Sequence, residues 1–73
     1  MSRGDILKGL KQIRKERKLT QLKVAMNLNI SREALSHYVN GKREPSIELL
    51  VKMSRYFNVS IDFLINGKEF EKF

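Results

Sequence analysis

The fold is decided by residues 19–40, which read LTQLKVAMNLNISREALSHYVN. The first half of this stretch predicts a helix over residues 21–28, because its apolar residues repeat at the spacing of one helical face. These apolar residues are Val24, Ala25 and Leu28. Thr20 precedes them, and its hydroxyl can accept a hydrogen bond from the first turn of a helix.

The second half predicts another helix, over residues 32–40, with Ser31 as its N-cap. Only residues 29–31 connect the two helices, and Asn29 tolerates the left-handed conformation that a tight helix exit requires. Ala25 is small enough to lie where the two backbones approach each other. The stretch therefore predicts a sharply angled helix-turn-helix pair, with an ordinary helical hairpin as the alternative.

Helical signals continue on both sides of this pair. Residues 5–18 carry apolar side chains at helical spacing, Pro45 and Ser46 introduce a helix over residues 47–57, and Ser60 introduces one over residues 61–65. Five short helices make a compact all-α domain. The candidate core consists of Leu10, Ile13, Val24, Leu28, Ile30, Leu35, Leu50, Met53 and Phe57.

The charge of the 73-residue chain is uneven. Residues 1–43 hold 11 basic and 3 acidic side chains, a net charge of +8, whereas residues 44–73 hold 4 basic and 5 acidic ones, a net charge of −1. A chain of this length supports one small core that buries about 60% of the unfolded surface. The basic half is typical of a surface for nucleic acid or membrane, although a merely solvated basic surface has the same composition.

The composition also excludes several functions. The chain has no cysteine, which excludes disulfides, thiol redox chemistry and thiolate metal sites. His37 is the only histidine, and the carboxylates are scattered, so we expect no enzyme, no metal and no cofactor. The sequence shows neither a leader pattern nor about 18 continuous apolar residues, which predicts a cytoplasmic protein, at the nucleoid when bound to DNA.

The predicted helix over residues 32–40 has two different faces. At about 100° per residue, its apolar side chains gather on one side and varied polar side chains on the other. Arginine can bind guanine bidentately, glutamate can accept from cytosine, and serine and histidine can bond base edges. We therefore predict base contacts, with a solvated helix face as the alternative for His37. The predicted base-contacting residues are Arg32, Glu33, Ser36 and His37.

Groups suited to phosphate lie on both sides of this helix. Lys42 and Arg43 place two cations where the helix ends. The helix over residues 21–28 offers its N-terminal amides and the positive end of its dipole. The predicted phosphate contacts are Thr20, Gln21, Asn40, Lys42 and Arg43.

These residues resemble the helix-turn-helix DNA-binding domain of phage repressors and Cro proteins, also called the xenobiotic-response-element type, over roughly residues 10–65. The resemblance is carried by LKQIR at 10–14, LTQ at 19–21, Val24-Ala25 with Leu28, IS at 30–31, NGKR at 40–43, PS at 45–46, VS at 59–60 and Leu64. It implies a lambda-repressor-like fold of five helices. It also implies phosphate contacts at Gln21, Asn40, Lys42 and Arg43, and base contacts at Arg32, Glu33, Ser36 and His37.

Three positions depart from the family pattern. Asn29 stands where glycine is frequent, which fits a left-handed conformation. Val39 stands where the family commonly carries a glutamate paired with the arginine matching Arg14, so Arg14 is expected to be released to phosphate or solvent, with solvent favoured. Phe63 stands where the family usually has a polar residue, which leaves a surplus aromatic side chain.

The C-terminal segment holds an apolar set that the small core does not need, namely Phe63, Ile65, Phe70 and Phe73. Exposed apolar patches usually mark interfaces, so we expect a twofold homodimer that places two copies of the helix over residues 32–40 about 34 Å apart on DNA. Completion of the core, or fraying of Phe70 and Phe73 at the terminus, is the alternative.

The sequence thus predicts a DNA-binding domain over residues 1–66, with the helix-turn-helix proper at about 20–40, and a short tail over residues 67–73. Its predicted function is sequence-specific binding of double-stranded DNA, as a repressor that occupies a palindromic operator. The alternative is an antitoxin-like module that binds another protein through the C-terminal apolar patch, with DNA binding secondary. A membrane-surface role is disfavoured, because the cations lie beside polar side chains suited to base contacts and because tryptophan is absent.

Overall fold

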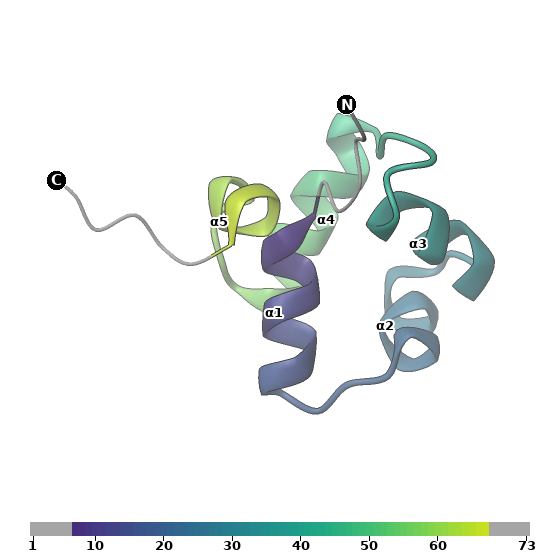
Figure 1. Ribbon diagram of the computed structural model, residues 1–73, viewed down its shortest axis with the longest axis horizontal. Coiled ribbons are helices and arrows are strands. Elements are labelled where there is room, and N and C mark those ends of the chain that lie inside the picture. The colour runs from purple at the N-terminus through teal and green to yellow at the C-terminus, as the bar shows by residue number, and fades with distance from the viewer. Residues whose placement is uncertain (1–6, 68–73) are drawn as a thin grey trace, which may run out of the picture.

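The computed structural model describes residues 7–67 and forms five helices over that range (Figure 1). They are α1 (Lys8–Glu16), α2 (Gln21–Leu28), α3 (Arg32–Val39), α4 (Ile47–Phe57) and α5 (Ile61–Asn66). The predicted all-α fold is confirmed, and the bounds of α2 and α4 agree with the prediction. None of the helices in residues 7–67 has the length and apolar character needed to span a bilayer.

The N-cap residues of α2, α3, α4 and α5 have hydroxyl side chains, as predicted. In each case the oxygen accepts a hydrogen bond from the backbone N–H three residues later, at 3.0, 2.9, 3.1 and 3.0 Å in chain order. The four capping residues are Thr20, Ser31, Ser46 and Ser60. An N-cap of this kind contributes about 1 kcal/mol to the stability of a helix.

The ends of α2 and α4 lie in the left-handed region. Asn29 has φ 62° after α2, and Asn58 has φ 59° after α4. Gly41 follows α3 and has φ 79°, a conformation that glycine adopts without strain.

The first helix is shorter than predicted at its C-terminal end. Its last residue is Glu16, and Lys18 adopts a left-handed conformation with φ 57°. This turn lets the Leu19 N–H donate to the Arg14 carbonyl at 2.9 Å, which leads the chain away from α1 toward α2. At the other end the prediction also included Leu7, which the structure places just before the helix, and Asp5 and Ile6, which lie outside the described residues.

The core draws apolar side chains from all five helices. Its buried residues are Leu7, Leu10, Ile13, Val24, Ala25, Leu28, Leu35, Val39, Met53, Phe57 and Leu64. Ile30 and Leu50, which were predicted for the core, are partly buried and pack against it. Ala25 is fully buried, as expected for a small residue between close helices.

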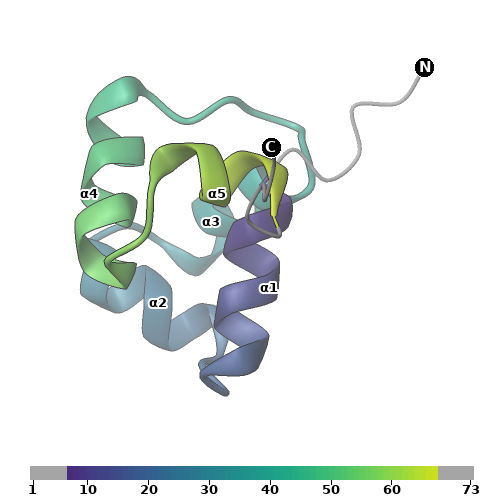
Figure 2. The ribbon, with the colours of Figure 1, turned by 90° about the vertical axis from the view of Figure 1, so that its left-hand side faces the viewer.

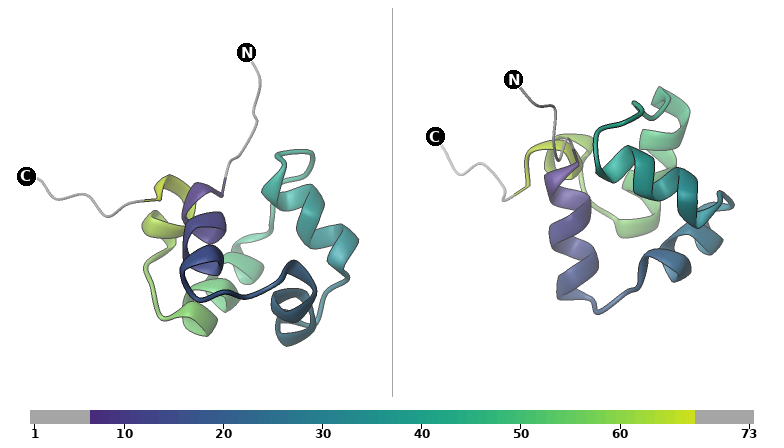
Figure 3. Two further views of the ribbon diagram at one scale, coloured as in Figure 1. Left: turned by 60° about the horizontal axis from the view of Figure 1, so that its bottom comes forward. Right: turned by 45° about the vertical axis from the view of Figure 1, so that its right-hand side comes forward.

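Gly9 in α1 allows a close approach between two backbones. A Cβ atom at this position would lie 1.6 Å from the carbonyl oxygen of Phe63 in α5. The backbone of α5 therefore rests directly on α1, and the two helices lie side by side (Figure 2). The α2–α3 pair lies on the opposite side of α1 from α5 (Figure 3).

Candidate nucleic-acid interface

The two faces predicted for α3 are present in the structure. Leu35 and Val39 are buried on its inner side, whereas Arg32 and Glu33 in its first turn are exposed. Ser36 and His37, one turn later, are half-buried. An α-helix with its side chains is about 10–12 Å across, which fits the major groove of DNA, about 12 Å wide.

Ser36 and Asn40 lie against each other at the C-terminal end of α3. The Asn40 Nδ2 donates a hydrogen bond of 3.3 Å to the Ser36 Oγ. The serine hydroxyl acts as an acceptor in this contact, so its own proton remains available to an external acceptor. The structure thus brings a predicted base contact and a predicted phosphate contact together in one pair.

The loop that follows α3 folds back onto the end of the helix. The N–H groups of Lys42 and Arg43 both donate to the His37 carbonyl, at 2.9 and 3.3 Å, and the Gly41 N–H donates to the Tyr38 carbonyl at 3.2 Å. These bonds satisfy carbonyls that the helix itself leaves without donors. The loop backbone is therefore fixed, while the charged side chains of Lys42 and Arg43 remain exposed.

The N-terminal end of α2 supplies the other predicted phosphate site. Thr20 is exposed and Gln21 is half-buried. Because Thr20 already accepts from the Lys23 N–H, its hydroxyl can still donate its proton outward. The first N–H groups of a helix have no intrahelical acceptor and favour an anion.

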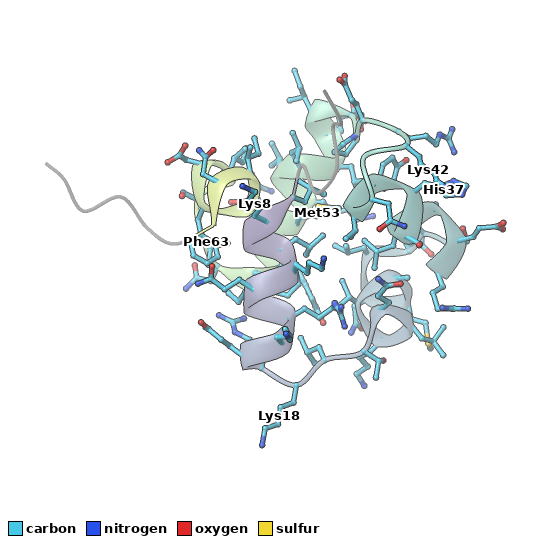
Figure 4. All side chains as sticks on the ribbon, viewed as in Figure 1. Lys8, Lys18, His37, Lys42, Met53 and Phe63 are labelled. Atoms are coloured by element: carbon cyan, nitrogen blue, oxygen red, sulfur yellow. The ribbon has the colours of Figure 1, made fainter. Side chains whose placement is uncertain are left out.

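The labelled side chains show how these groups are distributed. His37 on α3 and Lys42 in the following loop lie on the same side of the molecule, and Phe63 of α5 lies on the opposite side (Figure 4). A polar and cationic side, formed by α3 and its following loop, is therefore separate from the α5 side.

The prediction that Arg14 is released to phosphate or solvent is wrong. Its Nη1 donates a hydrogen bond of 3.0 Å to the Leu19 carbonyl, in a partly buried position. The guanidinium thus supports the loop before α2 in place of the family's glutamate partner. The sequence missed this role because a backbone carbonyl has no residue signature.

Two further cations are used internally in the same way. Arg17 donates through Nη2 to the Phe57 carbonyl at 2.9 Å, and its guanidinium carbon lies 5.9 Å from the centre of the Phe57 ring. Lys52 donates through Nζ to the Leu28 carbonyl at 2.9 Å. Each cation meets the last residue of a helix, where the dipole is negative.

The C-terminal apolar set is only partly available to a partner. Phe63 is partly buried against the core, which accounts for the surplus aromatic side chain, and Ile65 is 40% exposed. Phe70 and Phe73 lie outside the described residues.

The prediction overlooked three other exposed apolar side chains. Ile47 is 78% exposed, Met26 66% and Leu22 54%. Leu22 and Met26 are four residues apart and off the buried face of α2, a signal that the sequence does contain.

Comparison with known proteins shows which protein family the chain belongs to. A family profile described as Helix-turn-helix matches residues 10–64. The chain belongs to the Cro/repressor-type helix-turn-helix regulators. Members of this family bind DNA as transcriptional regulators and are not enzymes.

The family includes proteins of different organisms and roles. The chain is 43% identical over 63 residues to the uncharacterized HTH-type transcriptional regulator YqaE of Bacillus subtilis, covering 86% of this chain and 54% of YqaE. It is 45% identical over 53 residues to the antitoxin PezA of Streptococcus pneumoniae, covering 73% of this chain and 34% of PezA. The chain thus spans about half, or less, of the length of these relatives.

A solved structure supports the fold independently. The crystal structure of a transcriptional regulator from Listeria innocua superposes with a TM-score of 0.71 at 32% sequence identity. The match covers 89% of this chain and 60% of that one. The five-helix domain is therefore the part that this chain and the longer regulator have in common.

Proposed function

We propose that this helix-turn-helix regulator recognises a palindromic operator as a twofold dimer and represses transcription by occupying it in the cytoplasm. The observation that carries the proposal is the exposed polar side of α3, which continues into exposed cations at Lys42 and Arg43. In the proposed complex α3 lies in the major groove. Its base-contacting residues are Arg32, Glu33, Ser36 and His37.

The phosphate contacts place α3 in the groove from both ends. Lys42, Arg43 and Asn40 hold the strand beside the C-terminal end of α3, while Thr20 and Gln21 hold a phosphate at the start of α2. The fixed backbone of the loop after α3 supports this arrangement, because it limits the freedom of the two cations. Such contacts set the register of the protein on DNA and carry no sequence preference of their own.

We place the dimer contact on the α5 side of the residue 1–66 domain and in the tail over residues 67–73. Ile65 is exposed there, and Phe63, Phe70 and Phe73 complete the proposed contact. A twofold dimer would present two α3 helices about 34 Å apart, one turn of the duplex. Sedimentation at micromolar concentration should show a dimer, and an exclusively monomeric chain with and without DNA would contradict this part of the proposal.

A salt titration tests DNA binding itself. The logarithm of the affinity should fall with the logarithm of the salt concentration by about 0.9 for each phosphate contacted. Selection of bound sites from random duplexes should then return a palindrome. A flat salt dependence, or selection that enriches no motif, would contradict sequence-specific binding.

The second candidate function is that of an antitoxin-like module. The similarity to PezA favours it, as do the exposed apolar side chains of Leu22, Met26 and Ile47. In this reading another protein binds one of these side chains or the C-terminal apolar patch, and DNA binding is secondary. Weak, salt-independent DNA binding together with a stable complex formed with a co-encoded protein would favour this function over the first.

A further inference from the structure

Lys52 lies on α4 but acts at the end of α2. Its Nζ donates a partly buried hydrogen bond of 2.9 Å to the carbonyl of Leu28, the last residue of α2. A carbonyl at a helix C-terminus lacks an intrahelical donor and carries partial negative charge. An ammonium group satisfies both needs, because it donates a hydrogen bond and brings a positive charge.

The backbone around this carbonyl leaves it to a donor from outside α2. The Asn29 N–H donates to the Met26 carbonyl at 3.1 Å, and the Ile30 N–H donates to the Ala25 carbonyl at 3.0 Å. Among the residues that the structure describes, Lys52 is the donor that reaches Leu28. The next residues form the short turn into α3, so a shift of this carbonyl moves the start of α3.

A second contact between the same two helices adds to this restraint. The Asn27 Nδ2 donates to the Tyr56 hydroxyl at 2.9 Å, in an exposed position. Lys52 and Tyr56 are one turn apart on α4, and Asn27 and Leu28 are consecutive in α2. Of the two bonds, that of Lys52 is charged and partly buried, and charged hydrogen bonds of this kind are roughly twice as strong as neutral ones.

We propose that Lys52 is a positioning residue for DNA recognition, which fixes the α2–α3 turn and contacts no phosphate. The inference rests on the proposed DNA-binding function, and it assigns to one cation a role opposite to that of Lys42. The structure leaves both lysine residues exposed. They differ in that the Lys52 ammonium is bonded to the Leu28 carbonyl, whereas Lys42 has its charged group at the surface beside α3.

The test compares variants that lose the same charge. Lys52→Met keeps the aliphatic stem and removes the donor, and Arg55→Met removes a charge from the same helix at an exposed position. Lys42→Ala removes a proposed phosphate contact. For each protein, affinity for the selected operator is measured from low to high salt, together with affinity for a random duplex.

We expect Lys52→Met to lower operator affinity by up to about tenfold, the limit reached if this one charged hydrogen bond holds the turn in its binding conformation, and to lower random-duplex affinity less. Its salt slope should equal that of Arg55→Met, whereas Lys42→Ala should lose about 0.9 from the slope. Lys52→Arg, which keeps a donor and a charge, should restore affinity to within about twofold of the wild type. A slope for Lys52→Met that falls as it does for Lys42→Ala, or an affinity equal to that of Arg55→Met, would overturn the proposal.

Hydrogen exchange in the free protein separates this inference from the proposed function. The amides of Asn29 and Ile30 should exchange faster in Lys52→Met than in Arg55→Met, and unchanged exchange would contradict the positioning role. If the wild type shows no salt-dependent DNA binding, the proposed function fails, while the exchange result still decides whether Lys52 fixes the turn. Should Lys52→Met not fold, Lys52→Ala, which also lacks a donor, takes its place, and equal operator affinity of Lys52→Ala and Lys52→Arg would overturn the proposal.

Discussion

The α1–α5 contact and the α2–α3 pair are both helix pairs of one small domain, but different interactions hold them. In the first pair backbone rests on backbone, because Gly9 leaves no side chain between α1 and the Phe63 carbonyl. In the second pair a three-residue turn, a serine cap and a lysine from α4 set the geometry. The first arrangement stabilises the domain, and the second holds α3 in place while leaving its polar side exposed.

Gly9→Ala should have the largest effect on the contact between α1 and α5. The new methyl group would overlap the Phe63 carbonyl, so α5 must move, and we expect the free energy of unfolding to fall by about 3 kcal/mol. Thermal and denaturant unfolding measure this loss. Lys8→Ala, at the exposed neighbouring position, should change stability by less than about 0.5 kcal/mol.

DNA binding should respond differently to the same change. At a temperature where Gly9→Ala is folded, its affinity per folded molecule should remain near that of wild type if α5 contributes only to stability. A stability equal to that of wild type would instead show that α5 does not rest on α1 through the backbone.

Arg32→Ala tests the α2–α3 pair. It should weaken operator binding by about 1 to 3 kcal/mol and relax the preference at one base position, while the unfolding free energy stays within about 0.5 kcal/mol of wild type. Fluorescence anisotropy with duplexes that differ at single positions measures both effects. The control is Lys15→Ala, which removes a charge at an exposed position of α1. If Arg32→Ala weakened binding to all duplexes equally, Arg32 would make no base-specific contact.

Lys42→Ala should have the smallest effect of the three. It should weaken binding to every duplex alike and reduce the salt slope by about 0.9, because it removes one phosphate contact. The same anisotropy series, repeated over a range of salt concentrations, provides the measurement. If Lys42→Ala altered base preference and Arg32→Ala did not, the roles assigned to the two residues would be reversed.

The sequence predicts the local features of this fold well. Ser31 and Ser60 are visible as caps, because a cap needs only a hydroxyl at one position and an N–H three residues later. The end of α2 at Asn29 is also predicted locally, because asparagine tolerates the left-handed conformation that follows a helix. The helices, their order and the exposed side of α3 follow from such short-range patterns.

The sequence does not reveal contacts between segments far apart in the chain. Arg17 meets a carbonyl 40 residues away, and Lys52 meets one 24 residues away. Neither contact leaves a periodic pattern, and each acceptor is a backbone atom that every residue possesses. The partition of cations into internal donors and candidate phosphate contacts therefore required the structure.

The contact between α1 and α5 also brings together residues 7 and 67, the two ends of the described part of the chain. A Cβ atom on Gly67 would lie 3.5 Å from the Cβ of Lys8 and 3.8 Å from the Gly9 nitrogen. The two ends of the described chain are thus neighbours, and Lys8 lies away from His37 and Lys42 (Figure 4). The chain therefore enters the described part at residue 7 and leaves it at residue 67 from the same place, clear of the side proposed to face the duplex.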